Sequence, residues 1–155
     1  MSEFTEIGAR LLVVFDGRCG FCNASVRWLA RRDGHDRLRF APADAPRVGA
    51  LLGRHGLGAA AFAEGAGTLV VVREAGGEDE LLLSRSDAVA TLLAELPGAW
   101  PAVAAVLHAV PRPLRDGGYR IVARLRYRMG GRLEVCPLPT EREREKFLAS
   151  AGPAE

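Results

Sequence analysis

The segment from Leu11 to Cys22 reads LLVVFDGRCGFC, and the rest of the chain is organised around it. Its first five residues, 11–15, are apolar with β-branched valines at the centre, which is typical of a buried strand. Asp16-Gly17 then forms a turn dipeptide. Over residues 20–32 the apolar positions are three and four apart, which predicts a helix. Two cysteines therefore lie where a strand leads into the first turn of a helix.

This placement favours thiol chemistry. Residues i and i+3 share one helical face, so the sulfurs of Cys19 and Cys22 can meet and form a disulfide. The helix N-terminus stabilises a thiolate and so lowers a cysteine pKa. We expect Cys19, nearest the helix end, to be the exposed nucleophile and Cys22 to resolve the mixed disulfide. Gly20 is expected to leave room for a partner thiol.

Asp16 has two interpretations. An ionised carboxylate three residues before Cys19 raises the pKa of that thiol, but the same carboxyl could take and return the proton of Cys22. Alternatively, Asp16 is a turn residue that accepts hydrogen bonds from backbone N–H groups at the helix start. The sequence leaves both roles open.

A metal site and inert packing are the alternatives to redox chemistry at the cysteine pair. A zinc site usually needs a second close pair of ligands. The other candidates, Cys136 and the three histidines, are isolated in the sequence. Cys136 precedes two nearby prolines, so it either reaches the cysteine pair in an extended loop or is a buried small residue.

Length and composition predict one domain over residues 1–155, with a core at about 10–97 and a helical extension at about 98–149. Hydrophobic residues make up 48% and charged residues 26% of the chain, as in globular proteins. A net charge of +2 with few aromatics among the arginines argues against nucleic-acid binding. We expect no transmembrane segment, no signal peptide and a cytoplasmic location, where a cysteine pair is more often catalytic than structural.

The pattern after residue 36 completes an α/β domain with a mixed sheet of about four strands. Residues 37–41, 68–73 and 80–83 are strand candidates, the first parallel to strand 11–15 and the last two forming an antiparallel hairpin. A short helix is predicted near residues 48–55. A capping box, Ser84-x-x-Asp87, opens a further helix that reaches Leu96. No Gly-rich nucleotide loop occurs, so no organic cofactor or metal is predicted.

The extension is predicted to be helical over residues 100–110 and 114–129. Thr140-x-x-Glu143 is a second capping box, which predicts a short helix ending at Leu148. The apolar stripe of the longer helix, normally the face packed on a core, consists of Ile121, Val122, Leu125 and Met129.

Arginines are dense in this extension, and an i, i+4 stripe joins Arg120, Arg124 and Arg128, with Arg112, Arg115, Arg126 and Arg132 nearby. Such a stripe binds an anionic or protein partner, or it is a solvated face paired with acidic segments. The first reading makes the chain a non-catalytic interaction module with an Arg-rich docking surface, which is the alternative to an enzyme.

The Asp16-x-x-Cys19-x-x-Cys22 motif after an apolar strand resembles the DCC family of thiol-disulfide oxidoreductases, named for that aspartate and the two cysteines. Further matching segments over about residues 11–148 are Arg39-Phe40-Ala41, PRPLRD at 111–116, Tyr119, Ala123-Arg124, Arg126-Tyr127-Arg128, Gly131-Arg132, Cys136 and Pro139-Thr140. The resemblance implies a thioredoxin-like fold and exchange with a dithiol or disulfide substrate, either a protein or a small thiol. Unlike thioredoxins, the chain has no proline between residues 59 and 68, and Thr68 is expected nearest the cysteine pair.

Overall fold

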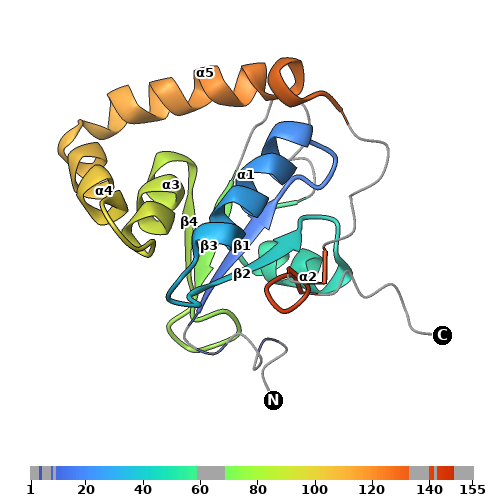
Figure 1. Ribbon diagram of the computed structural model, residues 1–155. Helices are drawn as coiled ribbons and strands as arrows, with labels where there is room; N and C mark the ends of the chain where they lie inside the picture. Colours follow the sequence, from blue (N-terminus) through green and yellow to red (C-terminus); the bar gives the residue numbers. More distant parts are fainter. Residues whose placement is uncertain are drawn as a thin grey trace.

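A four-stranded mixed sheet forms the centre of the computed structural model (Figure 1). Its strands lie in the order β2 (Leu38–Pro42), β1 (Leu11–Phe15), β3 (Val70–Arg73) and β4 (Leu81–Ser84). β1 pairs parallel with β2 and antiparallel with β3, and β3 pairs antiparallel with β4. The predicted strands, the parallel first pair and the hairpin are confirmed. The structure describes residues 4, 8, 10–58, 69–132, 140, 141 and 143–148.

Five helices occur in these described ranges: α1 (Gly20–Arg32), α2 (Pro46–Arg54), α3 (Arg85–Ala94), α4 (Trp100–Ala109) and α5 (Arg112–Gly130). β1 is buried along its whole length, and its alternate side chains enter two separate cores. Leu12 and Val14 pack with α2 on one face of the sheet, whereas Val13 and Phe15 pack with α1 and α3 on the other. Since β1 is anchored on both faces, the turn that follows it is held in place.

The long helix α5 extends from α4 across the N-terminal end of α1 (Figure 1). Its predicted apolar stripe does not face the core: Ile121 is 61% exposed and Met129 is 54% exposed. The inward face instead carries Tyr119, Ala123 and Arg126, and Arg126 is buried. The expected orientation is wrong because contact with α1 and α3 is made by polar and small side chains. No helix in the described ranges is long and apolar enough to cross a membrane.

The two predicted capping boxes have different outcomes, and neither is accompanied by all that was expected of it. Ser84 is the N-cap of α3, but its side chain makes no capping hydrogen bond, and Asp87 pairs with arginines of α5. At the second box Glu143 does accept a hydrogen bond from the Thr140 N–H at 2.9 Å. The residues after it form turns rather than the predicted helix, because Phe147 pairs with Phe40 at the outer edge of β2.

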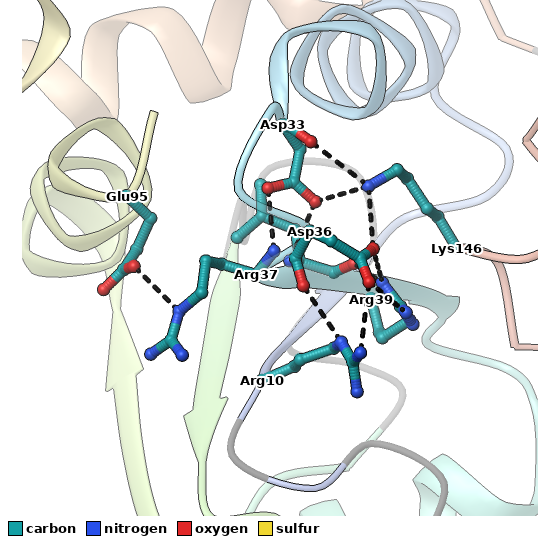
Figure 2. A network of polar contacts seen from close by, with 8 residues as sticks. Arg10, Asp33, Asp36, Arg37, Arg39, Glu95 and Lys146 are labelled. Atoms are coloured by element: carbon teal, nitrogen blue, oxygen red, sulfur yellow. Dashed lines mark hydrogen bonds and ion pairs between the residues drawn. The ribbon is translucent and has the colours of Figure 1, made fainter. Parts of the chain in front are cut away.

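A network of charged side chains fastens this last segment to the loop after α1 (Figure 2). The Asp33 carboxylate is fully buried and accepts hydrogen bonds from the backbone N–H groups of Arg37 and Leu38, at 2.9 and 3.0 Å. Lys146 Nζ adds a third contact to Asp33 at 2.6 Å and a contact to Asp36 at 3.1 Å. A hydrogen bond from Arg39, which has the largest effect, and one from Lys146 hold the pKa of Asp36 well below its usual range.

We expect Lys146→Met to lower the free energy of unfolding by about 1.5–3 kcal/mol, the range for hydrogen bonds to charged groups. The variant removes the cation from a buried carboxylate that has no access to water. Urea denaturation at pH 7 measures the change. Arg144→Met is the matched control, because Arg144 is exposed two residues away. Equal stability of the two variants would show that the Lys146–Asp33 contact contributes nothing.

Candidate active site

Cys19 and Cys22 lie at the start of α1, where the buried strand β1 turns into the helix. Cys19 is the N-cap residue, and its Sγ accepts a hydrogen bond from the Cys22 backbone N–H at 3.1 Å. Asn23 Nδ2 closes the turn by donating to the carbonyls of Gly17 and Cys19, at 2.8 and 3.0 Å. Both cysteines are free thiols. The turn therefore presents one sulfur to the unpaired N–H groups of the helix, as predicted.

Access to the two sulfurs is the reverse of the expectation. Cys19 is fully buried, whereas Cys22 is half-buried and lines an apolar pocket. The chain after α5 lies against the Cys19 turn: Cys19 forms a bridge with Arg132, and the Gly20 N–H donates to the Gly131 carbonyl at 3.0 Å. This contact joins segments more than a hundred residues apart, so local sequence spacing could not predict it.

The room predicted beside Gly20 is taken up by α5. A Cβ on Gly20 would lie 2.0 Å from the Gly130 carbonyl oxygen, and one on Gly130 would lie 2.1 Å from the Phe21 nitrogen. Two glycines therefore let the backbones at the start of α1 and the end of α5 touch. The adjacent Phe21 lines the pocket together with Cys22.

Arg126 is the site residue that the sequence analysis did not single out. It is 4% exposed, its Nη1 donates to Cys22 Sγ at 3.4 Å, and its Nη2 lies 3.4 Å from Asp16 Oδ2. In the sequence Arg126 is one of several arginines near the stripe of Arg120, Arg124 and Arg128, but it shares a helical face with Tyr119 and Ala123. That shared face is the signal in the sequence that distinguishes Arg126 from Arg124.

Asp16 connects the cysteine turn to α5. One carboxylate oxygen accepts from the Arg18 backbone N–H at 3.0 Å, and the other accepts from the Tyr127 hydroxyl and faces Arg126. Burial, followed by the hydrogen bond to Asp16, raises the pKa of Tyr127 to about 12. Asp16 thus makes the contacts of a turn residue and also holds two side chains of α5.

The two cysteines have opposite pKa shifts. The hydrogen bond from the Cys22 thiol, aided by the Cys22 N–H and the charge of Arg126, lowers the pKa of Cys19 to about 7 against the opposing effects of burial and Asp16. The same thiol–thiolate contact, with burial, raises the pKa of Cys22 well above its usual range. A thiol with a lowered pKa is thiolate to a larger extent near neutral pH than an ordinary cysteine.

The remaining candidate residues are placed as follows. Arg120, Arg124 and Arg128 are exposed, so the stripe lies on the outer side of α5. Thr68 and Cys136 lie outside the described residues. Among the residues that the structure describes, no three His, Cys, Asp or Glu side chains are grouped so that they could hold a metal ion.

Comparison with known proteins identifies the family. The profile described as DCC1-like thiol-disulfide oxidoreductase matches residues 13–132, which include the cysteine turn and all of α5. The chain belongs to this family. The uncharacterized protein YuxK of Bacillus subtilis is 28% identical over 137 residues, covering 88% of this chain and 93% of YuxK. The chloroplastic DCC family protein At1g52590 of Arabidopsis thaliana is 29% identical over 137 residues, covering 88% and 74%. No solved structure gives a significant match.

Proposed function

We propose that the chain is a thiol-disulfide oxidoreductase in which Cys19 attacks and Cys22 resolves. The observation that carries this proposal is the environment of the Cys19 sulfur, which accepts hydrogen bonds from the Cys22 N–H and thiol and lies near Arg126. These contacts favour the thiolate, the form of cysteine that reacts with disulfides. Membership of the DCC1-like family supports the same reaction class.

The reaction has two exchange steps. The Cys19 thiolate attacks one sulfur of a substrate disulfide, which forms a mixed disulfide and releases the other half of the substrate as a thiolate. Cys22 then loses its proton to the released thiolate or to water, and its sulfur attacks the Cys19 sulfur. The second half of the substrate leaves as a thiolate. The substrate gains two electrons, and the Cys19–Cys22 pair becomes a disulfide that a cellular dithiol or glutathione reduces again.

Arg126 and Asp16 act on this pair as positioning residues. The Arg126 guanidinium contacts Cys22 Sγ, so it stabilises the negative charge that Cys22 develops in the second step. Asp16 holds that guanidinium and the start of α1 together. Because both Asp16 oxygens are engaged, we favour this role over proton exchange with Cys22.

We propose that the substrate is a dithiol or disulfide, carried either by a protein or by a small molecule. Binding of an anionic partner at the exposed arginines of α5 stays a prediction. The interaction-module alternative requires that Cys19→Ser leave the function intact. The metal-binding alternative requires stoichiometric zinc in the purified protein.

A redox titration tests the proposal directly. Purified protein is equilibrated in dithiothreitol and glutathione buffers, and alkylated thiols are counted by mass spectrometry. We expect one reversible two-electron transition that maps to Cys19 and Cys22. The midpoint potential of this transition shows whether the protein acts as a reductant or as an oxidant. Thiols that never couple would contradict the proposal. Thiols that react only after a chelator is added would favour the metal site.

A further inference from the structure

The pocket beside Cys22 is large and almost wholly apolar. It has a volume of about 870 Å³ and lies between α1, α3, α4 and α5. Phe21, Trp28, Leu93 and Val122 contribute apolar walls, and Cys22 lies on the same surface. The volume is within the range of small-molecule sites. An apolar body of a ligand therefore fits here next to the cysteine pair.

Arg115 is a cation in the wall of this pocket. Its side chain is 10% exposed, and its Nη2 lies 2.9 Å from Asp87 Oδ1. Its Nε and Nη1 are shielded from water and have no hydrogen-bond partner in the described part of the chain. The second oxygen of Asp87 is engaged by Arg112, so Asp87 uses one nitrogen of Arg115 and leaves the other two. Buried N–H donors without acceptors are unfavourable, and a ligand acceptor would relieve them.

We propose that this pocket binds an amphipathic substrate with an apolar body and a carboxylate, and that Arg115 binds the carboxylate. A guanidinium with unpartnered donors suits a carboxylate, because hydrogen bonds between two charged groups are stronger than those to a neutral acceptor. Arg115 and Arg126 are eleven residues apart on α5, about 16 Å along a helix axis. The ligand therefore lies along α5 between Arg115 and the cysteine pair. This rests on the proposed function, because it makes the ligand of the pocket the substrate of that pair.

Decanoate and decanol are the probes, since they differ only in the head group. Binding is followed by tryptophan fluorescence, because Trp28 lines the pocket and contacts Trp100 edge to face at 4.9 Å between ring centroids. We expect saturable decanoate binding that is about tenfold or more tighter than decanol binding, from a charge-assisted hydrogen-bonded pair. Arg115→Met should remove this preference.

Arg112→Met is the matched control, because Arg112 also pairs with Asp87 but is exposed and does not line the pocket. It should retain the preference for decanoate. If wild-type protein binds both probes with equal affinity, or binds neither, this result alone overturns the proposal. So does an unchanged preference in folded Arg115→Met protein.

The two proposals fail separately. Selective decanoate binding by a protein whose cysteines do not couple in the redox titration would refute the oxidoreductase and keep the carboxylate site. A normal redox transition without decanoate selectivity would refute the substrate class and keep the oxidoreductase.

Discussion

Replacing Cys19 by serine is expected to abolish thiol-disulfide exchange, whereas replacing Cys22 by serine is expected to trap the protein as a mixed disulfide. Cys19 provides the sulfur with the lowered pKa, and a serine hydroxyl does not ionise near neutral pH. Without Cys22 nothing inside the site attacks the Cys19–substrate bond, so the adduct persists.

The measurement uses the reduced variants in a Cys136→Ser background, so that the third cysteine of the chain does not contribute. The substrate is 5,5′-dithiobis(2-nitrobenzoate), whose released thiolate absorbs light. The Cys136→Ser protein should release two equivalents of the coloured thiolate and end with a Cys19–Cys22 disulfide. The Cys22→Ser variant should release one equivalent, and its mass should show that the other half of the reagent stays bound to Cys19. The Cys19→Ser variant should react no faster than a cysteine in an unfolded peptide.

A stable adduct on the Cys19→Ser variant, but not on the Cys22→Ser variant, would show that Cys22 is the attacking cysteine and Cys19 the resolving one. This outcome has a physical basis, since Cys22 lines the pocket and Cys19 is fully buried. Full reactivity of both variants would mean that the thiols act independently, and the proposed exchange would then be wrong.

The sequence was sufficient to predict the sheet because each strand carries its own signal. The five apolar residues of β1 predict burial on both faces, and the hairpin follows from two short strands around a turn. The family resemblance and its redox motif were equally local, and the matched profile confirms the family. Such signals depend on neighbouring residues only.

The environment of the motif depended on long-range contacts and was predicted poorly. Burial of Cys19 results from Gly131 and Arg132, and the cation at the site comes from Arg126. The apolar stripe on α5 suggested the wrong inner face, because hydrophobic periodicity assumes that the apolar side of a helix packs inward. On α5 the contacts with the start of α1 are made by a charged side chain, Arg126, and a glycine, Gly130, so that assumption fails at this helix.

Arg126→Met is expected to raise the pKa of Cys19 above its wild-type value of about 7, because the positive charge near the thiolate is lost. Well below the pKa, each unit of increase lowers the thiolate fraction tenfold. The rate of alkylation by iodoacetamide, measured from pH 5 to 9, should therefore rise at a higher pH in the variant. Arg124→Met, at an exposed position of the same helix, is the control and should keep the wild-type profile.

Arg126→Lys separates charge from geometry. A lysine retains the positive charge but cannot reproduce the two contacts that Nη1 and Nη2 make to Cys22 and Asp16. Its alkylation profile should fall between those of wild-type protein and Arg126→Met. If all three profiles coincide while each protein stays folded, Arg126 has no part in setting the thiolate.

Arg126→Met should also change how the stability of the reduced protein depends on pH. A thiol whose pKa is lowered on folding, from an ordinary 9.0 to about 7, contributes stability that is fully present above pH 9 and is lost as the pH falls through 7. Wild-type reduced protein should thus gain stability between pH 7 and 9 in urea denaturation. Arg126→Met should gain less over this range, because its Cys19 pKa lies closer to the unfolded value. It should also be harder to reduce, since a less stabilised thiolate favours the disulfide. A pH dependence and a midpoint potential equal to those of Arg124→Met would show that Arg126 supports only the packing of α5 on α1.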